Sequence, residues 1–374
     1  TADSRQQTAD SHNYSPQLRV LYITHYSGFG GANFALHGLM LDLRERYGVI
    51  PSVLVPCSGK FNDILSREGF EVFCNSFYMW VGGNRLRSKC KYVIKHLLNR
   101  LYYHKNIYRI LKDKHFDIIH TNSTIQDTGS FIAQHFSLPH VWNLMEYGDH
   151  DYNVHYLMPH AYVRSRYSRS DAIIAISDAV REDFVNERKV CPAEKTRTIY
   201  LGLSIPNAYD KLYVHDGRVN FCITGGVSAG KNQIMAIKAC AQLKTFTDKF
   251  TLHIVGSGNP GYIAGLNDLV KSYGLDGHVK FWGWRDDVND ILHNMDVGLM
   301  LSKREAFGRV TVEYMLNYMP VIGVDTGATP EIVVDGDTGC ICPLNDADRL
   351  AELMHRFITN PELLHSMGNK GREH

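Results

Sequence analysis

Short apolar runs alternate along the chain with longer stretches whose apolar residues recur every three or four positions. RVLYIT at 19–24 is such a run, and a glycine-containing loop and a stretch with helical spacing from Phe34 to Leu43 follow it. This alternation is typical of a parallel sheet covered by helices. The other runs that predict strands in the first half are SVLVP (52–56), DIIHT (117–121), HVWNL (140–144) and AIIAIS (172–177).

The alternation breaks at 202–218, where glycine, proline and charged residues show no period, and then starts again. The runs that predict strands in the second half are NFCIT (220–224), TLHIVG (251–256), VKFWG (279–283), DVGLML (296–301) and PVIGV (320–324). Helical spacing covers 231–244, 261–273, a stretch from about 309, and a last helix over 346–357. Two α/β halves of similar size predict two Rossmann-like domains.

The length supports this division, because 374 residues exceed the size at which one hydrophobic core usually stops growing. We place an N-terminal domain at 18–205 and a C-terminal domain at 206–374. Residues 1–17 are polar and lack the apolar centre of a signal peptide. We expect them to be a disordered leader or a remnant outside the folded domains.

Composition excludes some classes of function. A net charge of +1 gives no indication of a nucleic-acid partner. The eight cysteines are scattered, and several lie inside apolar runs, which favours reduced thiols in a cytoplasmic protein over a disulfide framework. No apolar run approaches the roughly 18 residues of a transmembrane helix.

The stretch 85–114 is strongly basic, with ten Arg or Lys residues and one acid, Asp113, among interleaved apolar residues. One interpretation is a pair of solvated helices with an apolar inner face. The other is a basic amphipathic surface that rests on anionic lipid. The sequence leaves both open.

TGGVSAGKN at 224–232 matches the start of an ATP-binding P-loop, but Asn232 stands where that loop needs Ser or Thr to bind magnesium. A P-loop protein also needs an apolar strand that ends in Asp, whereas Asp296 begins its predicted strand. The signal for an ATPase is therefore weak. Lys231, at a strand-to-helix turn, suits a diphosphate instead.

SGFGGAN offers a second phosphate candidate, since Gly28, Gly30 and Gly31 let a ligand approach the backbone before a predicted helix. The loop lacks the third glycine of a dinucleotide fingerprint. A tight turn is the alternative.

Residues 301–339 carry most of the candidate chemistry. Glu305 and Glu313 flank Phe307-Gly308, and a helix that begins near Gly308 would bring both carboxylates to one cleft. Gly308 would leave amides at the helix start free for phosphate. By spacing alone, two solvated carboxylates remain an alternative.

These motifs together resemble the retaining glycosyltransferases of GT-B fold in the glycosyltransferase 4 group. The resemblance rests on S-x-x-E-x-F-G-x-x-x-x-E and G-x-x-x-E-I-V-x-D-G-x-x-G within 301–339, on the Gly-Gly loop at 30–31, and on AIIAIS-x-x-V-x-x-D, LHIVGSG and VKFWGWRDDV. It covers about 18–345. It implies an α/β GT-B fold, in which two Rossmann-like domains face a central cleft, with the acceptor on the N-terminal side and the donor on the C-terminal side.

The resemblance also implies roles for individual residues. Glu313 would hold the ribose hydroxyls, Glu305 the hydroxyls of the transferred sugar, and Lys231 would neutralise the leaving diphosphate. The remaining implied donor contacts are the amides of Phe307 and Gly308, the helix start at Gly30 and Gly31, and the backbone from Trp282 to Arg285.

Two departures from the family pattern stand out. Gly226 replaces a usual arginine, so one cation for the diphosphate is missing, and Arg309 is the candidate to replace it. The family's catalytic-side histidine falls at Asn122, two residues after His120. We keep His120 as a candidate sugar contact, with a structural residue at a strand end as the alternative. Asn122 and Glu146 are candidate acceptor contacts, and a surface carboxylate is the alternative for Glu146.

The implied reaction moves a hexose from a UDP- or GDP-sugar to a glycan, lipid-linked or protein acceptor, with retention at the anomeric carbon. We expect no required cofactor or metal; three D-x-D matches, beginning at 149, 335 and 346, lack the strand context of a metal site. The alternatives are a sugar-nucleotide epimerase or hydrolase of the same fold, a non-catalytic partner subunit, and a P-loop NTPase.

Overall fold

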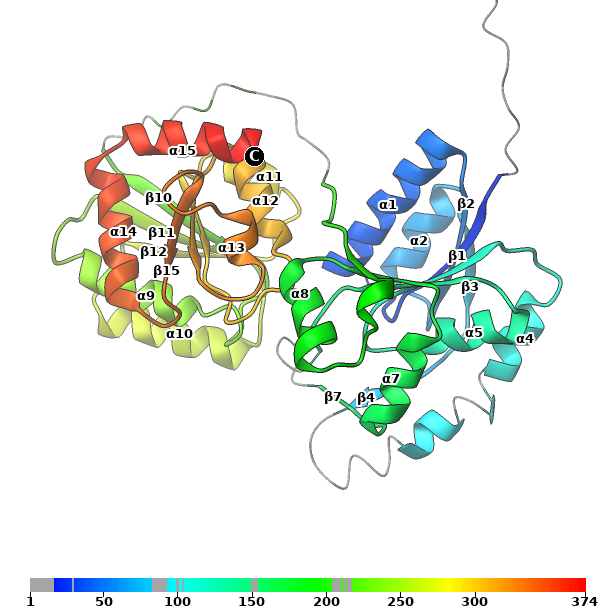
Figure 1. Ribbon diagram of the computed structural model, residues 1–374. Helices are drawn as coiled ribbons and strands as arrows, with labels where there is room; N and C mark the ends of the chain where they lie inside the picture. Colours follow the sequence, from blue (N-terminus) through cyan, green and yellow to red (C-terminus); the bar gives the residue numbers. More distant parts are fainter. Residues whose placement is uncertain are drawn as a thin grey trace, which may run out of the picture.

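A computed structural model describes residues 17–28, 30–82, 93–98, 101–102, 104–148, 154–203, 209, 211, 213 and 217–374. Two α/β domains lie side by side, with the C-terminal helix α15 on the C-terminal domain (Figure 1). The predicted boundary at 205/206 and most of the predicted leader lie outside the described residues. Within the described residues, no helix is both long and apolar enough to cross a membrane.

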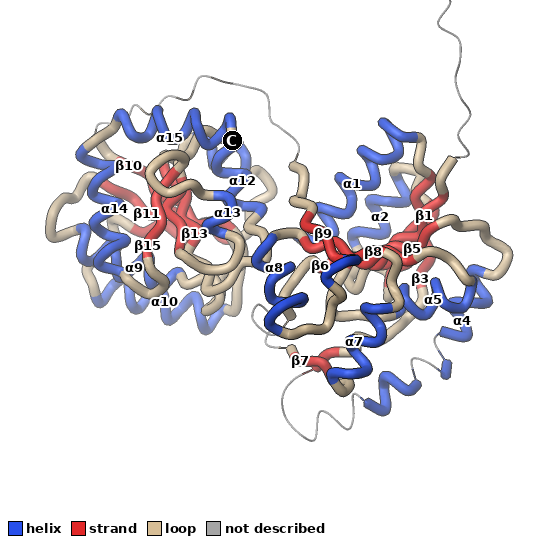
Figure 2. The backbone as a smooth tube through the Cα atoms, viewed as in Figure 1, coloured by secondary structure: helices blue, strands red, loops and turns tan. Residues whose placement is uncertain are grey.

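The N-terminal domain contains a parallel sheet of order β3-β2-β1-β5-β6-β8-β9 with helices on its faces (Figure 2). Its strands are β1 (Arg19–Ile23), β2 (Ile50–Val55), β3 (Glu71–Cys74), β5 (Ile118–Asn122), β6 (His140–Leu144), β8 (Ala172–Ala175) and β9 (Thr196–Thr198). Its helices are α1 (Gly31–Tyr47), α2 (Lys60–Arg67), α4 (His104–Leu111), α5 (Thr128–Phe136), α7 (His160–Ser168) and α8 (Asp178–Glu182). Two short strands, β4 (Val81–Gly82) and β7 (His155–Tyr156), pair antiparallel outside this sheet.

The C-terminal domain contains a second parallel sheet, of order β12-β11-β10-β13-β14-β15. Its strands are β10 (Val219–Thr224), β11 (Phe250–Val255), β12 (Val279–Gly283), β13 (Val297–Met300), β14 (Val321–Val324) and β15 (Gly339–Cys342). Its helices are α9 (Gln233–Leu243), α10 (Pro260–Ser272), α11 (Val288–His293), α12 (Arg309–Leu316), α13 (Thr329–Ile332), α14 (Ala347–Thr359) and α15 (Glu362–Glu373).

Burial explains why the apolar runs predict the central strands so well. All six residues of β11 are buried, because helices cover both faces of a parallel sheet. The seven described cysteines are free thiols, five of them buried, which agrees with the expectation of reduced cysteines.

The prediction of 346–357 as the last helix is wrong, since α15 follows it. Two glycines obscure α15 in the sequence because glycine disfavours helix interiors. Here they permit close packing: a Cβ at Gly368 would lie 2.1 Å from the carbonyl oxygen of Tyr318, and one at Gly371 would lie 3.3 Å from Met315 Cγ.

Both sheets reverse their strand order at one point, between β1 and β5 and between β10 and β13. At such a point, the loops after the two neighbouring strands turn to opposite sides and leave room for a ligand at the carboxyl edge. The fold therefore singles out four segments: the loops after β1, β10 and β13, and the end of β5.

Candidate donor site

Lys231 and Glu305 meet at the reversal point of the C-terminal sheet. Lys231 ends the loop after β10 and Glu305 lies in the loop after β13, and their side chains form an ion pair of 2.6 Å. The amide of Lys303 donates to the carbonyl of Gly230 over 2.9 Å, which fixes the two loops against each other. The structure thus brings together two residues, 74 positions apart in sequence, that the motifs single out separately.

The loop that carries Lys231 is held by its neighbours. The amide of Val227 donates to the carbonyl of Ser257, and Gly256 has a positive φ of 146°. A Cβ at Gly256 would lie 1.8 Å from the carbonyl oxygen of Gly225, so only glycine allows this close approach. Asn232 directly precedes α9 without a side-chain capping hydrogen bond, and its amide side chain donates to Asn345.

Glu313 and Arg309 occupy the first turns of α12, which follows Gly308. Gly308 has φ 88° and ψ 51°, and no side chain caps this helix, so its first amides remain available to an anion. Burial raises the pKa of Glu313, while the guanidinium of Arg309, 3.3 Å from its carboxylate, acts in the opposite direction. Phe307, directly before Gly308, is buried and fixes the start of the helix.

The side chains on the β12 side of the site turn to other partners. Trp282 donates from Nε1 to Nδ1 of His253 over 3.1 Å, and burial lowers the pKa of that histidine to about 4. Arg285 binds the carboxylate of Asp287 with two nitrogens. The carbonyl of Gly226 accepts from Gln233. Because the side chains of Trp282 and Arg285 are bonded to other residues of the protein, a ligand here would contact the backbone of this segment.

The glycine loop of the N-terminal domain leads into α1, which begins at Gly31 after Gly30 and has no side-chain cap. Asn33 holds this loop, because its amide donates to the carbonyls of Tyr26 and Gly28 and its oxygen accepts from Thr24. No motif singled out Asn33, although asparagine in the first turn of a helix often forms hydrogen bonds with the preceding loop.

His120 and Asn122 lie on β5, at the reversal point of the N-terminal sheet. His120 is buried with its ring 5.0 Å from Tyr22, and burial lowers its pKa to about 4, so it is neutral at pH 7. Asn122 donates to the carbonyl of Ala32 over 3.3 Å and accepts from Asn143. Asn122 therefore ties the start of α1 to the sheet, and its acceptor role stays a prediction.

Glu146 is buried, and its carboxylate accepts hydrogen bonds from Ser123 Oγ and the amide of Thr124. The carbonyl of Glu146 accepts from Thr124 Oγ1 as well. These bonds support a structural role, so its role toward the acceptor stays a prediction.

Replacing Glu146 by Leu is expected to lower the free energy of unfolding by about 1–3 kcal/mol, because Ser123 Oγ and the amide of Thr124 both lose their acceptor, Glu146 Oε1. Urea denaturation measures this. As a control, Glu71→Gln breaks an exposed pair with Lys114 and should cost less than about 1 kcal/mol. Unchanged stability together with a raised KM for the acceptor would instead assign Glu146 to acceptor binding.

The two domains touch around this site. Ser177 Oγ donates to the carbonyl of Ala306 over 2.6 Å, and the Arg309 guanidinium lies 5.5 Å from the ring of Phe34 on α1. The carboxylate of Glu331 accepts from the amides of Asp178 and Ala179, the first two residues of α8. A carboxylate at a helix start is a favourable contact.

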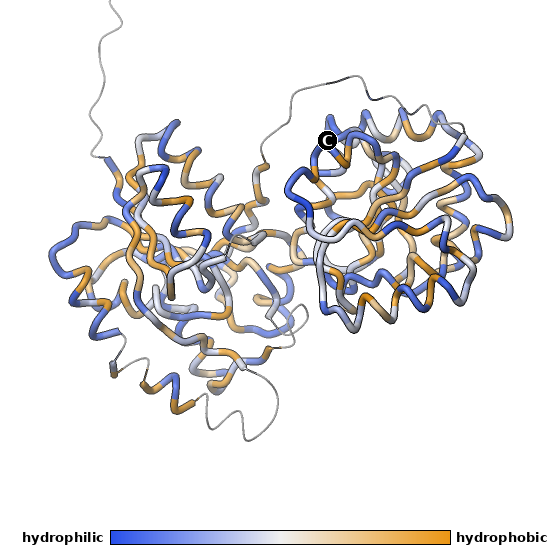
Figure 3. The backbone as a smooth tube through the Cα atoms, turned by 180° about the vertical axis from the view of Figure 1, so that it is seen from behind, coloured by the Kyte–Doolittle hydropathy of each residue, from blue (hydrophilic) through white to orange (hydrophobic). Residues whose placement is uncertain are grey.

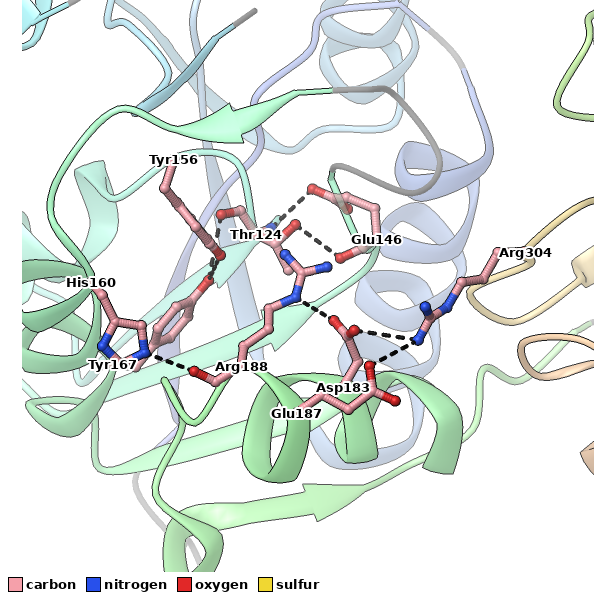
Figure 4. A network of polar contacts seen from close by, with 9 residues as sticks. All are labelled: Thr124, Glu146, Tyr156, His160, Tyr167, Asp183, Glu187, Arg188 and Arg304. Carbon is pink, nitrogen blue, oxygen red and sulfur yellow. Dashed lines mark hydrogen bonds and ion pairs between the residues drawn. The ribbon is translucent and has the colours of Figure 1, made fainter. Parts of the chain in front are cut away.

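A second contact joins Arg304, just before Glu305, to the N-terminal domain (Figure 4). Its guanidinium lies 3.3 Å from Asp183 and 3.5 Å from Glu187. Arg188 binds the same Asp183. Burial raises the pKa of Asp183, and the two arginines oppose this. The loop that carries Glu305 therefore contacts the N-terminal domain at two positions. One is Arg304, and the other is the carbonyl of Ala306, two residues further along the chain.

Comparison with known proteins identifies the two domains. A model of the glycosyl transferases group 1 matches residues 211–374, and a model of glycosyltransferase family 4 matches residues 62–205. The chain belongs to the glycosyltransferase family 4 group. Both domains of this glycosyltransferase contribute residues to the site described above.

Individual relatives match parts of this chain. It is 35% identical over 137 residues to an N-acetyl-alpha-D-glucosaminyl L-malate synthase of Bacillus anthracis. The matched residues make up 37% of this chain and 35% of that protein. It is 24% identical over 291 residues to an uncharacterised glycosyltransferase of Methanocaldococcus jannaschii, with 75% of each covered. The chain thus spans about a third of the length of the first of these curated relatives.

Solved structures confirm the predicted GT-B fold. Anabaena HepE in complex with UDP and glucose superposes with a TM-score of 0.76 at 21% identity, over 96% of this chain and 94% of that one. The lipopolysaccharide outer core galactosyltransferase WaaB, in its apo form, gives 0.72 at 17% identity over 94% of both chains. At these identities the likeness concerns the fold.

Proposed function

We propose that this protein is a retaining glycosyltransferase that moves a hexose from a UDP- or GDP-sugar to a glycan or lipid-linked acceptor in polysaccharide synthesis. The observation that carries the proposal is the Lys231–Glu305 pair at the reversal point of the C-terminal sheet. An uncapped helix start and the carboxylate of Glu313 follow within eight residues of Glu305. Family membership supports the same reaction.

Each donor group has a chemically suited partner in this proposal. Glu313 accepts hydrogen bonds from the ribose hydroxyls; burial raises the pKa of this carboxylate, and the guanidinium of Arg309 acts in the opposite direction. Glu305 accepts from hydroxyls of the hexose. Lys231, the α12 amides and the α1 amides face the diphosphate.

Arg309 also replaces the cation that Gly226 cannot supply. Its guanidinium lies between Glu313 and the ring of Phe34, that is, between the nucleotide side and the start of α1. A diphosphate bound there would contact Lys231, from the loop after β10, and Arg309, from the start of α12. This pair of cations allows binding without a metal, so we propose no cofactor.

In the reaction, the bond from the anomeric carbon to the phosphate oxygen breaks and its electron pair leaves with the diphosphate. The acceptor oxygen forms its bond on the same face, and its proton passes to the departing phosphate oxygen. Lys231 and the helix amides stabilise the charge that grows on the leaving group. Neutral His120 can donate to or accept from a sugar hydroxyl.

The acceptor side and the location complete the proposal. We place the acceptor against the N-terminal domain, near Asn122 and the start of α1. Free cysteines throughout the described residues support a reducing, cytoplasmic setting. A lipid-linked acceptor would bring the enzyme to the membrane surface.

The test is release of nucleotide from radiolabelled UDP- and GDP-sugars, with and without membranes or extracted glycolipids as acceptor. We expect release from one donor only, and only with acceptor, together with label in the acceptor fraction. Equal release without any acceptor would favour the hydrolase or epimerase alternative. No release, together with restored activity of a second glycosyltransferase on addition of this protein, would favour a partner subunit.

A further inference from the structure

Arg304 directly precedes Glu305, and its side chain reaches away from the donor site into the N-terminal domain. Its guanidinium lies 3.3 Å from a carboxylate oxygen of Asp183 and 4.5 Å from the centre of the Tyr147 ring. Tyr147 lies in the loop after β6 and Asp183 directly after α8, and both residues are almost fully buried. A guanidinium that has an aromatic face and a carboxylate as partners is held in one orientation. Arg304 therefore fixes the backbone that also carries Glu305.

The N-terminal domain presents an acidic place that this arginine completes. Asp183 and Glu187 begin and end one short helical segment, and Arg188 binds one carboxylate oxygen of Asp183. Arg304 lies beside the other oxygen of Asp183 and 3.5 Å from Glu187, so the two arginines approach Asp183 from opposite sides (Figure 4). The charges of these four side chains balance. Without Arg304, two carboxylates would share one arginine, which is costly for a buried carboxylate such as that of Asp183.

Within its own domain, Glu305 is held by its backbone and by Lys231. The amide of Ala328 donates to the carbonyl of Glu305 over 2.9 Å, and the carboxylate of Glu305 pairs with Lys231 at 2.6 Å. In the proposed reaction Lys231 turns to the diphosphate, so binding of the donor weakens this pair. The contacts of Arg304 and of the Ala306 carbonyl with the N-terminal domain remain, one on each side of Glu305.

The place of Arg304 between the domains gives its contact a larger effect. Figure 3, which views the molecule from behind, shows that the backbones of the two domains approach each other only over a short zone. The contact of Arg304 with Asp183 crosses this zone. Because Arg304 and Glu305 are neighbours in sequence, a shift of the first displaces the second, and orienting groups must be held closely to act on a bound substrate.

We propose that Arg304 is a positioning residue for sugar transfer: bound to Asp183 and Tyr147, it holds Glu305 against the hexose once Lys231 has turned to the diphosphate. This inference rests on the proposed function and deepens it. The hexose end of the donor site then depends on the N-terminal domain, whereas Glu313 and the start of α12, at the nucleotide end, belong to the C-terminal domain. Loss of Arg304 therefore slows transfer and leaves nucleotide binding intact.

The test combines initial rates at saturating donor with calorimetric binding of UDP and GDP, which lack the hexose. Arg304→Met should lower kcat roughly tenfold, because a small displacement of an orienting group slows the reaction, and should bind the nucleoside diphosphate like the parent. Arg304→Lys should recover part of the rate, since the charge returns without the planar shape. The control Arg349→Met breaks an exposed pair with Glu352, at 2.8 Å on α14, and should match the parent in both measurements.

A double-mutant cycle tests whether Arg304 acts through Glu305. Glu305→Gln keeps the shape of the side chain and should slow transfer by itself. Adding Arg304→Met to this variant should slow transfer by less than about twofold more, because the group that Arg304 positions has already been altered. Losses that multiply would mean that Arg304 only holds the domains together and would overturn the proposal. For an Arg304→Met protein that unfolds, Glu187→Gln removes an exposed partner of Arg304 and should give a smaller loss of kcat with unchanged nucleotide binding.

The remaining outcomes separate this inference from the proposed function. A parent that transfers sugar, with an Arg304→Met variant that has the same kcat, would overturn the positioning role alone. Equal losses of rate and of nucleotide binding in Arg304→Met would also overturn it, since a displaced Glu305 affects only the hexose. A parent that transfers no sugar would contradict the proposed function and this inference together.

Discussion

Replacement of Lys231 by methionine is expected to lower kcat for sugar transfer by roughly 10²–10³-fold, the usual loss when one preorganised group at a developing negative charge is removed. Methionine keeps an unbranched side chain one atom shorter, and it removes the charge, the hydrogen-bond donors and the ion pair with Glu305. The reason for a loss in kcat is that negative charge on the diphosphate grows as its bond to the sugar breaks. Initial rates at saturating donor measure this.

Lys238→Met is the matched control, because Lys238 is exposed on α9, two turns beyond the loop. It should leave kcat unchanged. Lys231→Arg should recover part of the rate, since the charge returns with a different shape. A Lys231→Met enzyme with parental kcat and only a raised donor KM would mean that Lys231 contributes to ground-state binding alone.

Replacement of Glu313 by alanine is expected to raise the donor KM by about 100-fold, because two hydrogen bonds from ribose hydroxyls to an ionised carboxylate are lost, at about 1.5 kcal/mol each. Burial makes this carboxylate costly to leave unpaired, and in the free protein Arg309 is its partner. Donor dependence of initial rates measures the effect.

The control for Glu313 is Glu352→Ala on α14. Glu352 forms a comparable pair with Arg349, at 2.8 Å, but lies exposed on another helix. It should leave the donor KM unchanged. A Glu313→Ala enzyme with parental KM and reduced stability would assign the carboxylate to helix structure and contradict its ribose role.

The sequence predicted most of the strands because β10, β11 and β13 are buried runs with few interruptions. It predicted less well where tertiary contacts outweigh local pattern. β15 begins with Gly339, where a Cβ would lie 2.0 Å from the carbonyl oxygen of Val321, so a residue with low strand propensity starts a paired strand. α15 contains two glycines for the same reason.

The candidate site was predicted as separate motifs, and its assembly needed the fold. Lys231 and Glu305 are far apart in sequence, and only the order β10-β13 makes their loops neighbours. The contacts between domains were missed altogether. Glu331 lies inside a quoted motif, but nothing local indicates that it accepts from the amides of α8 in the other domain.

Glu146 shows the opposite difficulty. At the end of an apolar run it resembles a ligand-binding carboxylate, and a surface position is the other expectation. In the structure it is buried beneath two hydrogen-bond donors of a neighbouring loop. A carboxylate at a strand end can serve the fold as well as a ligand, and local sequence does not distinguish the two.

The central claim is that TGGVSAGKN and α12 form a diphosphate site that needs no metal. Calorimetric titration of the parent and of Glu313→Ala with UDP, GDP and ATP, each with and without magnesium, tests it most directly. We predict that one diphosphate binds equally well without magnesium and that Glu313→Ala loses this binding. Magnesium-dependent binding of ATP that is indifferent to Glu313 would contradict the account and would make the loop a P-loop.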